Sequence, residues 1–547
     1  MESGKSIENN VDVVEVRKNL YDIFKQNVDK NRSHPLVIFH GKHASYYSIL
    51  SMVDSMAESL KRKFSISRGD IVGIALPLSP QFFISFLALQ KIGGVAVPLD
   101  PALTTLELQN IRKLIHIKAM FCLNSTDLNI SKDSGIESVI LTRIQDFLPF
   151  EKAVATTAKH PSAYGRRISS ELNKARFAEL IYEAKGEQEQ VDPEKEPAVA
   201  LISPSRSGEL QAMFFTSSNL VSSAVAISRN LPPLKGRFRI GSVLPPFVPA
   251  SFQFSVVLPL FLGGTVTAVL ERNNYYKLFH LCSLFDCDYM LTSPYDLNRI
   301  LEDGLPNLAI RSMKGILCNS YLLNDLMREK MEKTYGTHVI EYYGIPEMMG
   351  ITHMQSPDRL KRKLGSPGFP IYGVEARIVE EKTHAPTPMG STGELLVNGP
   401  QLCRNFEPKH EEMEDYYYDH FFDSGDLARI DEDGSYFIED RRREAIVSEG
   451  ILVSSSEIEQ AISLVEGVSE VAVVGIGNNK GQEEILAVVS AGKETSGLSS
   501  KILSSCRRIL SSYKVPQKIE FREELPKSMA GKILKRQIIE ENEKKIQ

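Results

Sequence analysis

Short apolar runs alternate with longer amphipathic segments through the first half of the chain. Residues 71–76 and 95–100 are typical of buried strands, and residues 80–91 between them have the length and composition of a helix. The order recurs further on, where the apolar run 198–202 is followed by a predicted helix over 217–229. Strands separated by helices predict parallel sheets with helices packed on their faces.

A different pattern appears in the segment 423–450. Polar and apolar residues alternate in Ser435–Ile438, directly after Asp433-Gly434, and this combination strongly predicts a β-hairpin. An acid, Asp426, precedes the hairpin and an arginine, Arg441, follows it. If the two lie on one side, they can hold the diol of a sugar. The basic run that follows marks the expected passage from a large domain to a small one.

A serine- and glycine-rich loop, SPSRSGELQA, follows the predicted strand 198–202 and precedes the predicted helix. Such a loop between strand and helix is a common place for a phosphate, because backbone N–H groups and the helix terminus point at it. An ordinary strand-to-helix turn is the alternative, and the short pattern alone does not decide between them.

Composition narrows the class of protein. The chain has 547 residues, 42% hydrophobic and 24% charged, which is typical of a soluble protein of several domains. A net charge of −5 gives no sign of the concentrated basic surface that nucleic-acid binding usually needs. Six scattered cysteines and the absence of a signal peptide predict a cytoplasmic protein. The most apolar run, 254–264, is broken by Pro259 and is shorter than the ~18 residues of a transmembrane segment.

Several motifs together resemble the adenylate-forming enzymes, the superfamily of acyl-CoA synthetases, 4-coumarate–CoA ligases and beetle luciferases. They are LISPSRSGELQAMFFTSSNL from Leu201, YYGIPE from Tyr342, DSGDLARIDEDGSYFIEDRRREAIVSEG from Asp423 and LPKSMAGKILKR from Leu525. The last two are the most specific, because they keep the family's residues in its order and spacing. The resemblance covers nearly the whole chain.

The resemblance implies an α/β fold in two domains. Residues 1–440 are expected to form a large AMP-binding domain, with two mainly parallel sheet lobes and a small β-barrel-like part. Residues 441–547 are expected to form a small, mobile α+β lid, with the active site in the cleft. The implied reaction activates an aliphatic or aromatic carboxylic acid with ATP and Mg²⁺ to an acyl-adenylate, which CoA then accepts. A homodimer is a further expectation.

The resemblance also assigns roles to single residues. A carboxylate that attacks a phosphate brings two anions together, so cations are needed at that point. Lys532 matches the lysine that bridges the two anions, and Glu347 the carboxylate that binds Mg²⁺. Asp426 matches the acceptor of the ribose hydroxyls and Arg441 the arginine that steadies the same nucleotide. Each residue also has a structural alternative. Lys532 can be a solvated lysine of the tail and Glu347 a residue near a helix N-terminus. Asp426 can be a turn acid and Arg441 a surface arginine.

The remaining matches form the walls of the expected site. Tyr343 and Gly344 correspond to its adenine and acyl sides, and Gly450 is kept in the lid. In the phosphate loop Ser203, Ser207 and Gly208 remain as hydroxyl or glycine positions, while Ser205 replaces a glycine and keeps a hydroxyl.

The phosphate loop departs from the family pattern. Gln211 stands where the family has lysine, Glu209 adds an anion, and Pro204 lacks a backbone donor. Arg206, within the loop, can restore the missing cation with a fork that suits phosphate. Nearby, Tyr342 replaces a glycine and is expected beside the nucleotide.

These departures leave three functions open. The first is an active AMP-forming carboxylate–CoA ligase whose phosphate grip is rebuilt around Arg206, and retention of Asp426, Arg441 and Lys532 favours it. The second is a catalytically impaired nucleotide- or acyl-adenylate-binding homologue with a regulatory role. The third is an adenylating enzyme that uses an acceptor other than CoA.

Overall fold

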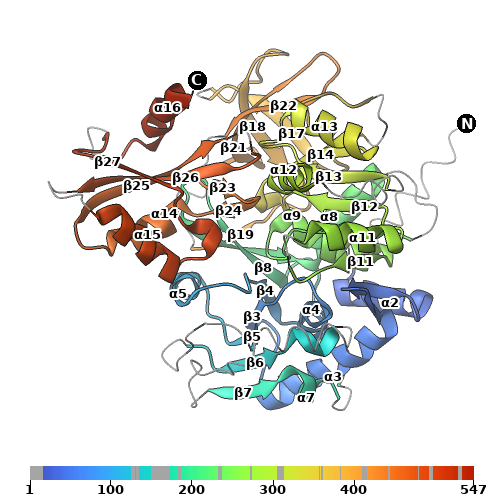
Figure 1. Cartoon of the computed structure of the whole chain (residues 1–547). Helices are drawn as coiled ribbons and strands as arrows, with labels where there is room; N and C mark the ends of the chain where they lie inside the picture. Colours follow the sequence, from blue (N-terminus) through green and yellow to red (C-terminus); the bar gives the residue numbers. More distant parts are fainter. Residues whose placement is uncertain are drawn as a thin grey trace, which may run out of the picture.

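The structure is a computed structural model of the chain, with its elements labelled in Figure 1. It describes the backbone of residues 17–124, 128, 130, 135–148, 172–182, 186–231, 237–271, 274–304, 313–356, 358, 361–381, 383–408, 416–441, 444–478, 480–491, 497–527 and 533–546, and their side chains except those of 440, 441, 545 and 546.

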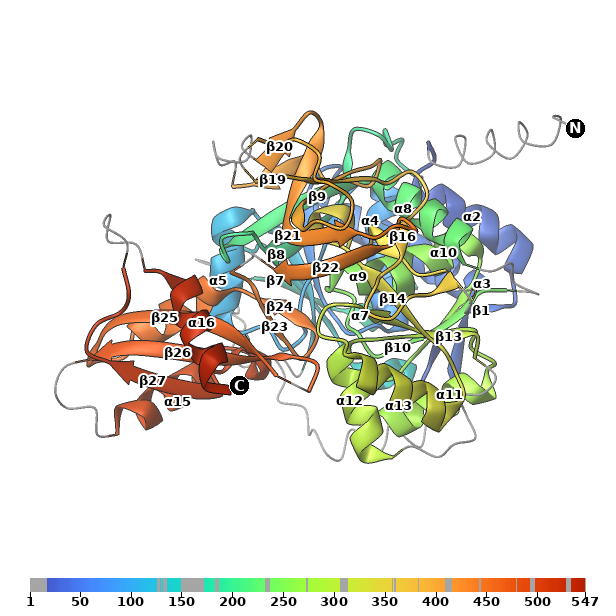
Figure 2. The same ribbon diagram turned by 90° about the horizontal axis from the view of Figure 1, so that it is seen from above.

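A nine-stranded sheet forms one lobe, and the strands from β14 to β1 in its spatial order run parallel. The spatial order is β16 (Phe369–Pro370), β15 (His353–Met354), β14 (Val339–Tyr343), β13 (Gly315–Asn319), β12 (Tyr289–Thr292), β10 (Arg239–Ser242), β11 (Thr265–Ala268), β1 (Pro35–Phe39) and β2 (Lys42–Ser45). Helices α11 (Tyr275–Leu284), α12 (Pro294–Asp303) and α13 (Asp325–Tyr335) lie together along one side of this lobe (Figure 2).

An eight-stranded sheet forms the second lobe. Its spatial order is β19 (Asn405–Glu407), β9 (Leu210–Thr216), β8 (Pro197–Pro204), β4 (Val95–Pro98), β3 (Ile71–Ala75), β5 (Ala119–Leu123), β6 (Ser138–Thr142) and β7 (Asn173–Arg176). The strands from β8 to β7 run parallel, whereas β9 and β19 are antiparallel additions. The two sheets confirm the predicted α/β fold.

One apolar core joins the two lobes, and helix α4 (Pro80–Ile92) lies inside it. Every residue of α4 is buried, which agrees with a sequence that has no polar face. The helix is closed by the side chain of Ser79, which accepts from the Phe82 N–H, and by Gly93 at φ +71°. Helices α2 (Leu20–Asn31), α3 (Tyr46–Phe64), α8 (Ser217–Asn230) and α10 (Leu258–Leu262) contribute to the same core. The shared core fixes how the carboxyl ends of the two sheets face each other.

The predicted hairpin belongs to a five-stranded antiparallel sheet. Its strands are β17 (Glu375–Val379), β18 (Gly393–Asn398), β21 (Phe421–Ile430), β20 (Tyr417–Tyr418) and β22 (Tyr436–Arg441), the last paired with β21. Gly434 adopts φ +81° in the turn, and Asp426 lies directly opposite Arg441. Asp426 does not precede the hairpin, as the sequence predicts, but belongs to its strand β21, and the pairing shifts register only after Leu427.

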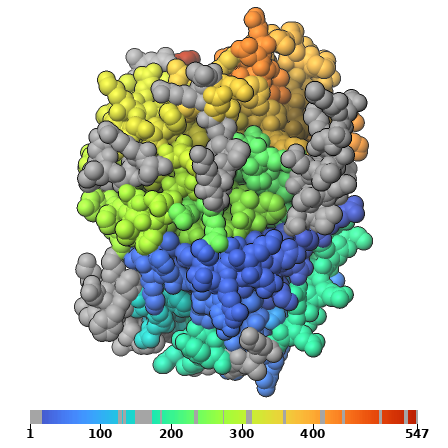
Figure 3. All heavy atoms as spheres, turned by 90° about the vertical axis from the view of Figure 1, so that its right-hand side faces the viewer, coloured from blue at the N-terminus to red at the C-terminus, as the bar shows by residue number. Residues whose placement is uncertain are grey.

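The C-terminal residues form a separate small unit (Figures 1 and 2). Its elements are the hairpin β23 (Ile446–Ser448) and β24 (Ile451–Val453), the sheet of β25 (Val468–Gly477), β26 (Glu483–Ala491) and β27 (Lys518–Arg522), and helices α14 (Ser455–Ser463), α15 (Leu498–Ile509) and α16 (Lys535–Ile546). Helices α14 and α15 share one apolar cluster with the sheet, and α16 belongs to a second cluster. Figure 3 shows a face formed mainly by the large domain, with colours from blue in the lower half to orange at the top. The boundary at residue 441 stays a prediction.

Candidate active site

A cavity of about 180 Å³ lies where the carboxyl ends of the two large sheets meet the hairpin β23–β24. Ligands of open α/β sheets bind at such edges. Five of the predicted site residues line it: Ser203, Tyr343, Gly344, Asp426 and Gly450. The structure therefore gathers residues from four distant segments of the chain into one site.

Tyr343 and Asp426 form the nucleoside side of the cavity. The Tyr343 hydroxyl donates to Oδ2 of Asp426, whose side chain is buried. The ring of His353 lies behind Tyr343, at 5.8 Å between centroids, and contacts Tyr436 at 4.5 Å. A buried carboxylate held in this way is a ready acceptor for a pair of hydroxyls. The side chain of Arg441, predicted to assist, lies outside the described residues.

The sequence predicts that the phosphate loop connects a strand to a helix. In the structure it is instead the tip of a β-hairpin. Strands β8 and β9 pair antiparallel, and Gly208 turns between them at φ +79°. Helix α8 starts only after β9, at Ser217, so its N-terminus is not part of the loop. The hydroxyl oxygens of Ser205 and Ser207 lie 2.9 Å apart at the tip.

The C-terminal unit covers this hairpin tip. The Gly208 carbonyl accepts hydrogen bonds from Oγ of Ser454 at 2.6 Å and from Oγ of Ser456 at 3.3 Å. The Arg206 carbonyl accepts from the Glu444 N–H at 2.9 Å. A Cβ on Gly208 would lie 2.6 Å from Oγ of Ser455, so the approach requires glycine. Gly208 thus contacts the C-terminal unit, and Ser205, Ser207 and Gly208 do not line the cavity.

Two substitutions in the loop have specific partners. The Arg206 guanidinium forms an ion pair with the buried carboxylate of Asp423, so its charge is already balanced. The amide Nε2 of Gln211 donates to Oε1 of Glu347 at 3.1 Å. Glu347, the predicted metal ligand, is buried in a short 3₁₀ turn, Pro346–Met348.

The buried hydroxyl of Ser203 has no hydrogen-bond partner among the described residues. An unsatisfied buried donor costs free energy, so a phosphate oxygen at this point would be stabilised.

Tyr342 lines the same cavity as Tyr343, and its expected place beside the nucleotide stays a prediction. Successive side chains of a strand point to opposite faces, and Tyr343 points to Asp426. The Tyr342 ring turns the other way and packs on Phe254, with 5.3 Å between centroids and 60° between planes. The apolar residues Val248 and Ala250 line the same cavity.

Comparison with known proteins decides the family. The model for AMP-binding enzymes matches residues 24–406, and the model for the AMP-binding enzyme C-terminal domain matches residues 457–532. The chain belongs to the AMP-binding enzyme family.

Similar proteins include ligases and synthetases. A long-chain-fatty-acid–CoA ligase from Bacillus subtilis is 25% identical, over 96% of this chain and 94% of that protein. The structure of an o-succinylbenzoate CoA synthetase from Bacillus subtilis, bound with a product analogue, matches with a TM-score of 0.77 at 20% identity, over 95% and 98% of the two chains. An amide bond synthetase from Marinactinospora thermotolerans matches with a TM-score of 0.74 at 18% identity, over 94% and 99%.

Lys532, the predicted catalytic lysine of this AMP-binding enzyme, lies outside the described residues. The described neighbours on either side, Lys527 and Ile533, form an isolated antiparallel bridge. Ile533 packs against the same apolar cluster as α16. The role of Lys532 stays a prediction.

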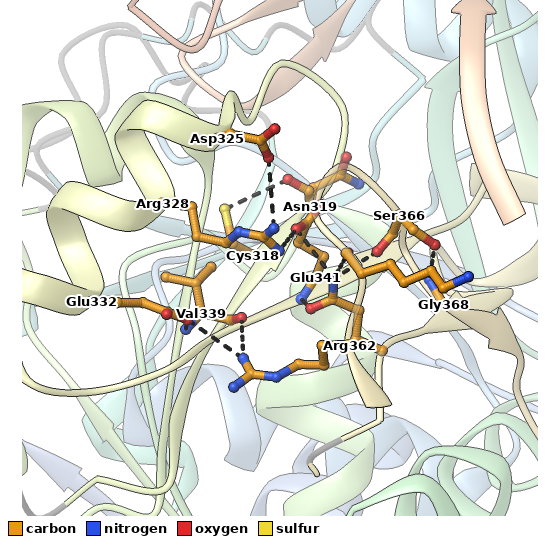
Figure 4. A network of polar contacts seen from close by, with 12 residues as sticks. Cys318, Asn319, Asp325, Arg328, Glu332, Val339, Glu341, Arg362, Ser366 and Gly368 are labelled. Atoms are coloured by element: carbon orange, nitrogen blue, oxygen red, sulfur yellow. Dashed lines mark hydrogen bonds and ion pairs between the residues drawn. The ribbon is translucent and has the colours of Figure 1, made fainter. Parts of the chain in front are cut away.

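A buried network holds the strand that carries Tyr342 and Tyr343 (Figure 4). Glu341 of β14 forms an ion pair with Arg328 of α13 and accepts from Nε2 of Gln355 at 3.2 Å. Nη1 of Arg362 donates to the backbone carbonyl of Val339 at 2.9 Å. Burial raises the pKa of Glu341 to about 7, against the pull of Arg328. The network fixes the end of β14 and hence the direction of both tyrosines.

Sequence reasoning missed the polar residues where the two domains meet. Asp100, Glu107, Glu457, Tyr513 and Lys514 all line the same cavity. Three of them lie in the stretches PLDP and YKVP, to which the sequence analysis assigns no role: Asp100, Tyr513 and Lys514. Their partners are distant in the chain, so spacing provides no signal for them.

The buried imidazole of His353 leads to a prediction about acid stability. Burial lowers its pKa from 6.5 to about 3, so between these values the unfolded chain takes up a proton that the folded chain does not. This residue therefore costs stability as the pH falls below about 6.5. We expect His353→Phe to gain about 2 kcal/mol relative to the parent protein between pH 7 and pH 5, measured by urea unfolding. An equal difference at both pH values would contradict the assignment.

Proposed function

We propose that this AMP-binding enzyme uses ATP to activate a carboxylic acid as an acyl-adenylate and then transfers the acyl group to the thiol of CoA. The observation that carries the proposal is the Tyr343–Asp426 pair, which lines a cavity that apolar residues such as Val248 and Ala250 also line. The CoA ligases among the similar proteins support CoA as the acceptor. The buried free cysteines agree with a reducing, cytoplasmic location, and no helix in the described part of the chain could cross a bilayer.

Each residue has a task in this reaction. Asp426 accepts the ribose hydroxyls and Tyr343 holds its carboxylate in place. Ser203 donates to a phosphate oxygen from the cavity wall. Lys532 neutralises the charge that develops when the carboxylate meets the α-phosphate. The apolar wall of Val248, Ala250 and Tyr342 excludes water from the acyl side.

Glu347 fits the demands of Mg²⁺. Magnesium prefers oxygen ligands and is often held by one or two carboxylates together with substrate phosphates. No group of three or more His, Cys, Asp or Glu side chains that could hold a metal occurs in the described ranges, so Glu347 would share the ion with the nucleotide. Bound there, the ion would supply positive charge to the phosphates. Gln211, which donates to Oε1 of Glu347, would orient the carboxylate.

A binder with little turnover is the second candidate function, and the phosphate loop favours it. Arg206 is paired with Asp423 and Gln211 is uncharged, so the described loop presents no unbalanced cation to a triphosphate. An acceptor other than CoA is the third.

ATP–pyrophosphate exchange over a panel of carboxylic acids separates an adenylating enzyme from a binder. We expect exchange with at least one acid, and its collapse in Lys532→Ala with the fold retained, because the bridging cation is lost. No exchange with any acid, while AMP still binds, would establish the binder.

Arg206 is expected to divide its charge between Asp423 and the bound phosphates. Arg206→Ala should lower kcat/KM for ATP in the exchange assay by about tenfold or more. The matched variant Asp423→Asn keeps the arginine, removes its counter-ion and should lower KM for ATP. If Arg206→Ala exchanges at the parent rate, the arginine serves only the ion pair.

The wall at Tyr342 points to a short or compact acid as the substrate. The ring fills the space between β14 and the π-helical turn Gln253–Val257, and no residue of that turn lines the cavity. An acyl chain that enters beside Gly344 therefore meets the Tyr342 ring.

Replacing this ring should change the preferred chain length. We expect Tyr342→Ala to raise the kcat/KM ratio of dodecanoate over butanoate by about tenfold or more, because each methylene that finds room is worth about 1–3 kcal/mol. Tyr342→Phe keeps the ring and should leave the ratio unchanged. If Tyr342→Ala and Tyr342→Phe give the same ratio of kcat/KM for dodecanoate over butanoate, the acyl chain does not contact the Tyr342 ring.

A further inference from the structure

Two helix N-termini face each other across the domain interface, and each carries a glutamate in its first turn. Glu107 belongs to α5 (Thr105–Leu114) of the large domain, where it completes a capping box with Thr104. Glu457 has the corresponding position in α14 of the C-terminal unit, next to its N-cap Ser454. Their side chains are 1% and 2% exposed. Two buried carboxylates at one place repel each other unless a cation separates them.

Lys514 supplies that cation. Its Nζ lies 2.7 Å from Oε1 of Glu107 and 2.7 Å from Oε2 of Glu457, and its side chain is 12% exposed. Burial opposes the charged form of Lys514, yet the two carboxylates raise its pKa. Burial likewise opposes the ionised form of Glu107, yet Lys514 lowers its pKa. The attraction between Glu107 and Lys514 is therefore present at neutral pH. It weakens as pH falls through the lowered folded pKa of Glu107 or rises through the raised folded pKa of Lys514.

Neighbouring hydrogen bonds attach the same C-terminal segment to α5. The backbone N–H of Ser511 donates to Oε1 of Glu107 at 3.1 Å, and its hydroxyl donates to Oε2 at 2.9 Å. Oγ1 of Thr104 donates to the Ile509 carbonyl at 2.8 Å. Residues 509–514 thus dock on one helix end through backbone as well as side-chain groups.

The docked segment also holds the hairpin that enters the cavity. The Ser448 hydroxyl, in β23, donates to the Tyr513 carbonyl at 2.7 Å. Val447 and Gly450 of this hairpin line the cavity, with Gly450 at φ +75° in the turn. A continuous polar path therefore runs from α5 through residues 511–514 to the hairpin.

We propose that Lys514, clamped between Glu107 and Glu457, is a positioning residue for the acyl-transfer step, because it latches the C-terminal domain in the orientation that places the hairpin β23–β24 in the cavity. The proposal rests on the proposed function, in which adenylation requires Lys532 at the α-phosphate. It names acyl transfer because Val447 and Gly450 of the hairpin line the cavity in this orientation, whereas Lys527 and Ile533, the described neighbours of Lys532, do not.

A latch made of charges suits a domain that has to separate again. The attraction within a buried ion pair is largely offset by the loss of hydration, so the closed position is specific without being permanent. An apolar seam of the same area would be exposed to water on each opening. When the domains part, Glu107 keeps the Thr104 N–H as a partner at 2.7 Å and regains water.

Measuring the two half-reactions separately tests the latch. Lys514→Met removes the cation and leaves two buried carboxylates in repulsion. We expect the rate of transfer from preformed acyl-adenylate to CoA, divided by the rate of ATP–pyrophosphate exchange, to fall by about tenfold or more. Lys514→Arg keeps the charge and should recover most of the ratio.

Lys118→Met is the matched control. Lys118 also forms a 2.7 Å ion pair, with Asp70, but within the large domain and away from the cavity. In Lys118→Met the ratio of the transfer rate to the ATP–pyrophosphate exchange rate should equal that of the parent protein. Equal losses in Lys118→Met and Lys514→Met would mean that general destabilisation is the cause, and the latch would be refuted.

Hydrogen exchange provides a readout that does not need activity. In the full-length protein with acyl-adenylate bound, Lys514→Met should speed the exchange of the peptide that contains the Ser511 amide, while Lys118→Met should not. Unchanged exchange would refute the latch even if the protein is a ligase. A parent protein with no exchange of ATP and pyrophosphate would refute the proposed function, and the amide measurement would still decide the latch.

Discussion

The site depends on the apolar core that the two large sheets share. Helix α4 is buried on every side, so it has to lie between elements that cover it completely. The parallel strands on both sides then end toward the same cleft, and β8 and β14 deliver Ser203 and Tyr343 to one cavity. Because this core is closely packed, the distance between the walls is set by the whole molecule rather than by the loops that line it.

Few cationic side chains of the described residues are available in the cleft to balance negative charge. Asp426 lines the cavity, and Glu347 and Asp423 are buried without lining it; their partners are Tyr343, Gln211 and Arg206 respectively. A triphosphate adds further negative charge, so the reaction depends on cations that arrive with the substrate or with the C-terminal segment. The altered phosphate loop therefore leaves most of the neutralisation of the triphosphate to cations outside the loop.

Polar and charged side chains make several of the contacts between the two domains. Ser454 and Ser456 bind the Gly208 carbonyl at one end of the contact, and Lys514 joins Glu107 and Glu457 at another. Groups of this kind can be hydrated when the domains part, which an apolar seam cannot. The same choice explains why the interface carries buried charges at all, since a buried ion pair adds little net stability.

Local signals were enough for many of the elements and for one part of the site. The alternation of apolar runs predicted the parallel sheets, because burial on both faces leaves no polar positions in a strand. Asp433-Gly434 predicted the hairpin, since Gly434 tolerates the φ of +81° that the turn requires, and the hairpin then placed Asp426 opposite Arg441.

Only the tertiary structure decided the rest of the site, because its determinants are long-range. The phosphate loop became a hairpin tip since residues 210–216 pair with β8 on one side and with Asn405–Glu407 on the other. The direction of the Tyr342 ring follows from the register of β14 against β13 and from the presence of Phe254. Ser511 and Glu107 meet across 404 positions of the chain. A pattern of neighbours in sequence carries no information about such contacts, since burial and charge balance are properties of the folded molecule.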